Sequence, residues 1–177
     1  MHEAAAKLAP QEDDSPSVWA DRPPAQIIDF ILRRYHEPLH RDLPQVLANA
    51  RAVEAEARGS RLCPEGLGAH LEQVALDVES HLGKEEKILF PLILGGRGRA
   101  AFMPIKVMMA EHQDHYANLA HTRALTNEFA LPPDASSAWR ALYLDLQRLE
   151  ADLRRHIAIE NDVLFPRVMA DGDRDDR

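Results

Sequence analysis

Cysteine is nearly absent from this sequence: Cys63 is the only one among 177 residues. One cysteine cannot form an intramolecular disulfide, which fits a reducing compartment, and it cannot build a metal site on thiolates. A metal ion bound by this chain would therefore need histidine and carboxylate ligands. A lone cysteine just ahead of a helix is typical of an inert thiol, and we assign Cys63 no role.

The sequence also lacks an excess of positive charge and a long apolar run. Its formal net charge is −8, and no basic tract offsets the acidic residues. Nucleic acid and membranes are therefore not expected partners. Residues 1–20 carry Glu, Asp, Pro and Ser without an apolar run, so they match neither a secretory signal nor a membrane anchor. We expect a cytoplasmic protein.

What the sequence does contain is four long helical patterns separated by stretches rich in Gly, Pro and Ser, with no competing strand alternation. The patterns cover residues 24–57, 63–94, 103–129 and 134–169. Short connections between long helices predict an all-α fold, an antiparallel up-down-up-down four-helix bundle. The predicted domain organisation is a disordered N-terminal segment over residues 1–22, the bundle over 23–170 and a charged tail over 171–177.

One motif occurs twice, and it consists of a histidine, a glutamate four residues later and then Leu-Phe-Pro. The paired residues are His81 with Glu85 and His156 with Glu160. Positions i and i+4 of a helix share a face, and both pairs lie on the apolar stripe that should face the core. Each copy can therefore present an imidazole and a carboxylate to one point, which is the pattern of a metal site.

The other two helical patterns carry His36 and His112 on their apolar stripes. In an antiparallel bundle all of these polar residues fall at one level along the axis, and the two halves of the chain repeat the same spacing. The predicted metal ligands are His36, His81, Glu85, His112, His156 and Glu160.

A simpler interpretation is that two His–Glu pairs merely satisfy each other by hydrogen bonding. Two identical pairs at one height, each facing another histidine, favour metal instead, because an unpaired buried carboxylate is costly. Imidazole and carboxylate without thiolate suit iron, with manganese or zinc as alternatives. We predict two iron ions bridged by Glu85, Glu160 and an oxo or hydroxo group, with positions open to NO, O₂ or peroxide. A ferritin-like Glu-x-x-His motif occurs only at Glu37–His40, where Pro38 distorts the turn.

Several neighbouring residues are candidates for weaker roles. Glu111, Tyr35 and Tyr116 lie where they could orient a ligating imidazole, although simple packing or exposure accounts for each of them as well. His115 fits a core or rim histidine better than a ligand. Pro38 removes one backbone hydrogen bond and should kink the first helix.

At these residues the chain resembles the haemerythrin-like (HHE) cation-binding family, and within it the di-iron proteins that repair iron-sulfur clusters. The resemblance covers residues 24–169 and is carried by Arg34-Tyr35-His36 with His40, Ser80-His81 with Lys84–Pro91, Glu111-His112, and His156-Ile157 with Glu160-Asn161 and Leu164–Arg167. Matching positions in that family are iron ligands, which implies this role for His36, His81, Glu85, His112, His156 and Glu160.

Two departures refine the resemblance. Oxygen-carrying haemerythrins use a fifth histidine one turn after the ligand of the third helix, and this chain has Tyr116 there, as in the four-histidine repair type. Repair proteins often carry an N-terminal domain with a cysteine pair, whereas about 22 residues without cysteine precede the bundle here.

The resemblance implies a function in the repair of iron-sulfur clusters damaged by nitrosative or oxidative stress. Damaged iron-sulfur proteins would be partners, small diatomic molecules or peroxide would be ligands, and the centre could reduce NO or peroxide. The alternative is a domain that binds or senses O₂ or NO reversibly without turnover. Metal storage ranks last, because one two-metal site has little capacity. The sequence leaves the oligomeric state open.

Overall fold

The computed structural model describes residues 14–172, and within this range every regular element is helical. A turn of π-helix is marked η. The elements are α1 (Pro16–Trp19), α2 (Pro24–Ile31), η1 (Leu32–His36), α3 (Glu37–Glu56), α4 (Leu67–Lys84), η2 (Glu85–Leu89), α5 (Phe90–Leu94), α6 (Gly98–Leu125), α7 (Ser137–Ile159), η3 (Glu160–Leu164) and α8 (Phe165–Gly172).

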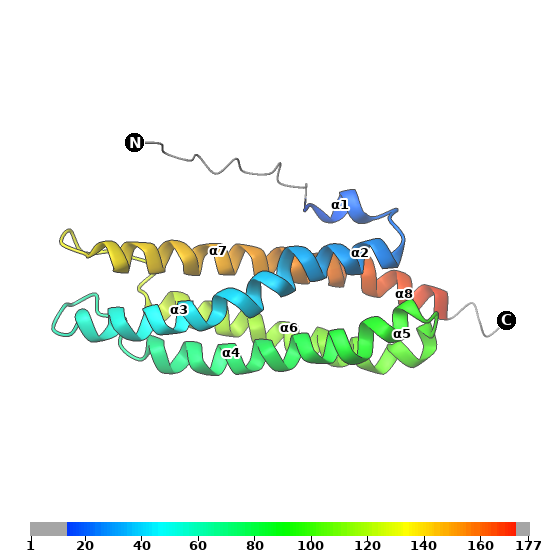
Figure 1. Ribbon diagram of the computed structural model, residues 1–177, viewed down its shortest axis with the longest axis horizontal. Coiled ribbons are helices and arrows are strands. Elements are labelled where there is room, and N and C mark those ends of the chain that lie inside the picture. The colour runs from blue at the N-terminus through cyan, green and yellow to red at the C-terminus, as the bar shows by residue number, and fades with distance from the viewer. Residues whose placement is uncertain (1–13, 173–177) are drawn as a thin grey trace.

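Consecutive elements join into four long rods that lie side by side along the molecule (Figure 1). Rod 1 is α2, η1 and α3; rod 2 is α4, η2 and α5; rod 3 is α6; and rod 4 is α7, η3 and α8. Helix α3 packs on α4 and α7, while α6 packs on α4 and α8. Rods that follow one another in the chain are therefore neighbours in space, and the predicted four-helix bundle is confirmed.

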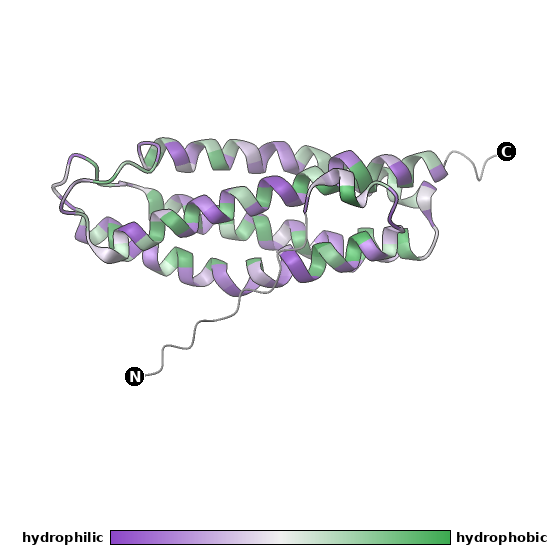
Figure 2. Ribbon diagram, turned by 90° about the horizontal axis from the view of Figure 1, so that it is seen from above, coloured by the Kyte–Doolittle hydropathy of each residue, from purple (hydrophilic) through white to green (hydrophobic). Residues whose placement is uncertain are grey.

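Each rod has one apolar face, which explains why the chain closes into a bundle. Green and purple residues are interspersed along every helix in Figure 2, so no rod is apolar all round. Four apolar clusters fill the interior of the described bundle, and two of them are large. One cluster includes Ile31, Leu89, Phe90, Leu164 and Phe165, and thus both Leu-Phe repeats of the duplicated motif. The other, toward the opposite end of the rods, gathers residues of α3, α4 and α7.

Capping interactions set the ends of the rods, and some of these ends differ from the predicted boundaries. Rod 2 ends in a Schellman turn, in which the N–H of Arg97 bonds to the carbonyl of Leu92 and Gly96 takes a φ of +67°. Rod 3 starts directly after this turn, at Gly98 rather than at the predicted residue 103. Rod 4 starts at Ser137 because the Ser136 side chain accepts a hydrogen bond from the N–H of Trp139.

Rods 1, 2 and 4 each contain one π turn, and each π turn ends two residues before a proline. The prolines are Pro38, Pro91 and Pro166. Proline has no N–H and its ring crowds the carbonyl four residues earlier, so a wider turn relieves the clash while the helix continues. The distortion expected beside Pro38 is thus present, as a π turn rather than a break. It recurs beside the other two prolines, where we did not expect it.

The chain packs on the bundle before rod 1 begins. Helix α1 contacts α7 and η3, the Trp19 ring stacks on Phe30 with centroids 4.1 Å apart, and Arg167 donates to the carbonyl of Ala20. The predicted disordered segment covers residues 1–22 and the predicted tail residues 171–177, and of these 1–13 and 173–177 lie outside the described residues. Within the described part, residues 16–19 form α1 and helix α8 extends to Gly172. Among the described helices, none has the length and apolar character needed to cross a membrane.

Candidate metal centre

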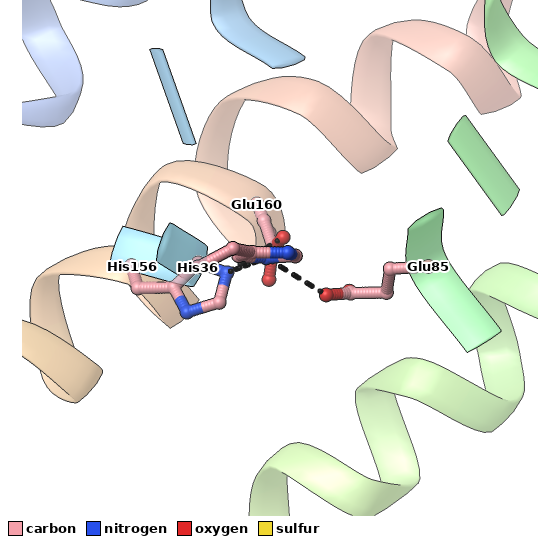
Figure 3. Close-up of side chains that lie close together, drawn as sticks. All are labelled: His36, Glu85, His156 and Glu160. Atoms are coloured by element: carbon pink, nitrogen blue, oxygen red, sulfur yellow. Dashed lines mark hydrogen bonds and ion pairs between the residues drawn. The ribbon is translucent and has the colours of Figure 1, made fainter. Parts of the chain in front are cut away.

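The structure brings all six predicted ligands together in the interior of the bundle. They form two groups that share both glutamates, and within each group the ligand atoms lie within 4.8 Å of one another. Site A consists of His36, Glu85, His156 and Glu160, and site B of His81, Glu85, His112 and Glu160. Figure 3 shows the four side chains of site A pointing toward one another from three rods.

Each carboxylate presents one oxygen to each site. Glu85 Oε2 lies 3.4 Å from Nε2 of His36, and its Oε1 lies 3.5 Å from Nε2 of His81. Glu160 Oε1 lies 3.0 Å from Nε2 of His156, and its Oε2 lies 3.2 Å from Nε2 of His112. All four imidazoles therefore aim Nε2 inward. Each of the two glutamates therefore lies between two histidines of different groups.

The π turns contribute directly to this geometry. His36 is the last residue of η1, while Glu85 and Glu160 are the first residues of η2 and η3. A π turn holds one residue more than an α turn, so adjacent side chains can both face inward. In η1 the adjacent side chains of Tyr35 and His36 are both 1% exposed.

Burial and charge shape the ionisation of the centre. Burial alone would raise the pKa of the Glu160 carboxyl, but His156 and His112 outweigh it and hold that pKa well below the usual range. Burial lowers the pKa of His36 and of His112, yet the facing glutamates outweigh it, so both imidazole pKa values are raised. The Glu160 carboxylate is therefore held ionised, while the imidazoles of His36 and His112 favour the protonated form.

The residues fit a metal ion. Both oxygens of Glu85 and one oxygen of Glu160 are buried and have no hydrogen-bond partner among the described residues. Buried carboxylate oxygens without partners are costly, and a cation between the imidazoles would satisfy them. Imidazole and carboxylate donors suit transition metals such as iron, manganese or zinc.

Three of the four imidazoles are held from behind by a hydrogen bond from Nδ1. His36 Nδ1 donates to Glu86 Oε1 at 2.8 Å, and His81 Nδ1 donates to Glu111 Oε2 at 3.0 Å. His112 Nδ1 donates to the Asn161 side-chain oxygen at 3.0 Å. Such partners orient ligating histidines and raise their basicity.

Sequence reasoning had considered Glu111 for this role but missed Glu86 and Asn161. A signal for both existed, because each directly follows the glutamate of the duplicated motif. His40 donates to Glu86 at 3.1 Å and contacts Glu79, so it extends the contacts of the centre toward the surface.

The other candidates stay outside the two ligand groups. The Tyr35 ring stacks on His156, with centroids 5.4 Å apart and planes 9° apart, whereas Tyr116 lies under the Arg154 guanidinium. His115 packs edge-on against His81, and burial, reinforced by that imidazole, lowers its pKa to about 4. Burial raises the pKa of the Cys63 thiol, which disfavours the reactive thiolate.

Fold and site together define a helical-bundle protein with a buried histidine–carboxylate centre compatible with metal. The model of the haemerythrin family, described as the Hemerythrin HHE cation binding domain, matches residues 28–168. The chain therefore belongs to the haemerythrin HHE cation-binding family.

Similar proteins carry a more specific name. The iron-sulfur cluster repair protein YtfE of Musicola paradisiaca is 39% identical over 166 residues, which cover 93% of this chain and 75% of that protein. The protein of the same name from Escherichia coli strain SMS-3-5 is 39% identical over 165 residues, covering 93% and 74%. That of Citrobacter koseri is 40% identical over 152 residues, covering 86% and 69%.

Proposed function

We propose that this protein is a non-haem di-iron protein of the cytoplasm that takes part in repairing iron-sulfur clusters damaged by nitrosative or oxidative stress. One observation carries the di-iron part: each of two buried carboxylates reaches both histidine pairs. The repair part is supported by the relatives named iron-sulfur cluster repair protein, which match nearly the whole chain.

In this proposal one iron occupies site A and the other occupies site B, while Glu85 and Glu160 bridge them together with an oxo or hydroxo group. Each carboxylate can place one oxygen in each site, so two glutamates can supply an oxygen ligand to both ions. Iron bound there would supply redox chemistry and positions open to NO, O₂ or peroxide.

The chain's own residues would hold and shield this centre. Glu86, Glu111 and Asn161 fix the imidazole rings so that Nε2 faces inward. Phe90 packs against His36 and Phe165 stacks on His112, so apolar rings cover the centre on the side of the Leu-Phe repeats. A small uncharged ligand would enter such an apolar surrounding more readily than a hydrated ion.

Metal content of the aerobically purified protein is the first test, measured together with its optical spectrum. We expect about two iron ions per chain and a near-ultraviolet band of an oxo bridge, since the donor set matches such a centre. The double variant Glu85→Ala, Glu160→Ala should lose both. A protein that resists iron loading, or a variant that keeps its iron, would show that the paired motifs are structural.

The repair role needs a second test, in which an iron-sulfur enzyme is inactivated by NO and then incubated with the iron-loaded protein. We expect its activity to recover with the wild-type protein and not with the double variant. No recovery, combined with a spectrum that changes reversibly with O₂ or NO, would instead identify a reversible binding or sensing domain.

A further inference from the structure

The four histidines of the centre are not held equally. His36, His81 and His112 each donate a hydrogen bond from Nδ1 to a side chain outside the centre. The Nδ1 of His156 is buried and has no hydrogen-bond partner within residues 14–172. The sequence repeat gives no hint of this difference, since His81 and His156 occupy equivalent positions in the two copies.

Packing, rather than a hydrogen bond, positions the ring of His156. The Tyr35 ring lies nearly parallel to it, so that contact is through the faces of the two rings. The Tyr35 hydroxyl donates away from the centre, to Asp14 at 3.3 Å. Neither the ring nor the hydroxyl of Tyr35 therefore accepts a hydrogen bond from Nδ1 of His156.

Of the three anchored imidazoles, one lies in site A and two lie in site B. Glu86 serves site A through His36 and is shared with His40. Glu111 serves site B through His81 and is shared with Lys84. Each site thus has one imidazole backed by a shared carboxylate. The remaining contrast is between His112, which accepts support from Asn161, and His156, whose Nδ1 has no hydrogen-bond partner among the described residues.

This contrast has a direct consequence for metal binding. An imidazole that binds metal through Nε2 carries its hydrogen on Nδ1, and an acceptor there fixes the ring and raises its basicity. Loss of such a partner typically lowers metal affinity about 10- to 100-fold. An unanchored N–H that stays buried adds a further cost.

We infer that the two metal positions are unequal: site B retains its ion, whereas site A releases its ion more readily. The inference rests on the two-metal part of the proposed function. The inference also extends the proposed function, because repair by iron donation needs a labile iron, whereas redox turnover needs a retained iron. One centre could provide both, with site A as the donor of a divalent cation and site B as the anchored position.

The test follows release of iron from the protein loaded anaerobically with two equivalents of Fe(II), using excess of a coloured chelator. We expect two phases of equal amplitude whose rates differ by at least about 10-fold. Crystals of the half-depleted protein, examined by anomalous scattering, should place the remaining ion between His81 and His112.

Variants of Asn161 separate an effect on the metal from a general effect on structure. Asn161→Ala removes the acceptor of His112 and should bring the two phases together, while Asn161→Asp keeps an acceptor and should preserve them. Asp162→Ala is the matched control, because Asp162 lies on the same π turn with an exposed side chain and should leave two phases. The wild-type rates and the position of the ion are decisive even if Asn161→Ala does not fold.

Three results would overturn the inference. Release of both ions in one phase would show that the sites are equivalent, and a half-depleted protein with its ion between His36 and His156 would reverse the assignment. Failure to bind any Fe(II) would refute the proposed function itself, which makes that outcome distinct from the other two.

Discussion

At the scale of single residues, the centre combines groups that titrate in opposite directions. Facing carboxylates raise the pKa of His36 and His112 despite their burial. A raised imidazole pKa contributes stability that is present below the unfolded pKa and is lost as the pH rises through the folded pKa. The lowered pKa of Glu160 contributes stability above the unfolded carboxyl pKa, lost as the pH falls through the folded value.

Bound metal should reverse the way in which stability changes as the pH rises. We predict that the metal-free protein has its highest Tm at mildly acidic pH and loses stability as the pH rises. Metal binding displaces protons from the imidazoles, so the loaded protein should gain stability over the same interval. Thermal unfolding followed by circular dichroism from about pH 4 to about pH 9, with and without bound metal, measures both curves. Parallel curves would contradict the assignment of these histidines as ligands.

His115 offers a second residue-level prediction. Its side chain is 2% exposed, and neither ring nitrogen has a partner among the described residues. Replacing an unpaired buried polar group by an apolar one of similar size can stabilise a protein, so His115→Leu should raise the free energy of unfolding by about 1 kcal/mol at neutral pH. Urea unfolding measures this value, and unchanged metal content would confirm that His115 is not a ligand.

The pH dependence of the same variant provides a control. A His whose folded pKa is lowered to about 4 costs stability as the pH falls below its unfolded value, because the unfolded chain takes up the proton first. The gain from His115→Leu should therefore grow between about pH 6.5 and about pH 4. A gain that is constant over this interval would mean that His115 is solvated in the folded protein.

At the scale of the helices, the π turns reconcile two demands. Rod 1 must bury Ile31 on one side of the turn and Leu39 on the other, and it must also turn both Tyr35 and His36 inward. A regular α-helix separates adjacent side chains by about 100°, and the wider π turn reduces that angle, which helps both side chains to face inward. One extra residue in the turn makes this possible while the rod continues in register.

Deleting one residue from the turn tests this account. Arg33 lies in η1 with an exposed side chain, and its ion pair with Asp29 is a surface pair of small value. Its deletion should convert η1 into an α turn, keep the helix content near that of the wild type and remove iron from site A. Tm should fall modestly, because the clash beside Pro38 returns. Circular dichroism and metal analysis of the variant measure these outcomes.

Deletion of a residue outside the π turn should behave differently. Arg41 is exposed in the regular part of α3, so removing it rotates every residue on one side by about 100° relative to the other. We expect a large fall in Tm there. If both deletions lowered Tm equally, the extra residue of the π turn would be as necessary for the packing of the rod as a residue of the regular helix.

At the scale of the whole molecule, the sequence predicts the arrangement of rods and the convergence of six side chains, since both follow from periodicity and from short connections. It does not reveal the hydrogen bonds behind the imidazoles, because those depend on how neighbouring rods are rotated. Glu86 looks like an ordinary exposed acid of a helical segment, yet it contacts a histidine on another rod. The sequence does not predict that Nδ1 of His156 lacks a hydrogen-bond partner among the described residues, because this too depends on how neighbouring rods are rotated.

The N-terminal segment shows a further limit of the sequence. Residues 14–22 have the polar composition of a disordered segment, but three specific contacts fix them to the bundle. Trp19 stacks on Phe30, Asp14 accepts from Arg155 at 3.2 Å, and Ala20 accepts from Arg167. One aromatic ring and two carbonyl or carboxylate acceptors are too few to produce a recognisable pattern.

These contacts lead to a prediction about the molecule as a whole, tested with two shortened chains that begin at Asp14 and at Pro23. The shorter chain loses the Trp19 contact and should be less stable by about 1–3 kcal/mol in urea unfolding. It also loses Asp14, which fixes the Tyr35 ring that covers His156. We therefore expect the fast phase of iron release to accelerate in the shorter chain while the slow phase stays unchanged. Equal acceleration of both phases would mean that the truncation loosens the bundle generally rather than uncovering site A.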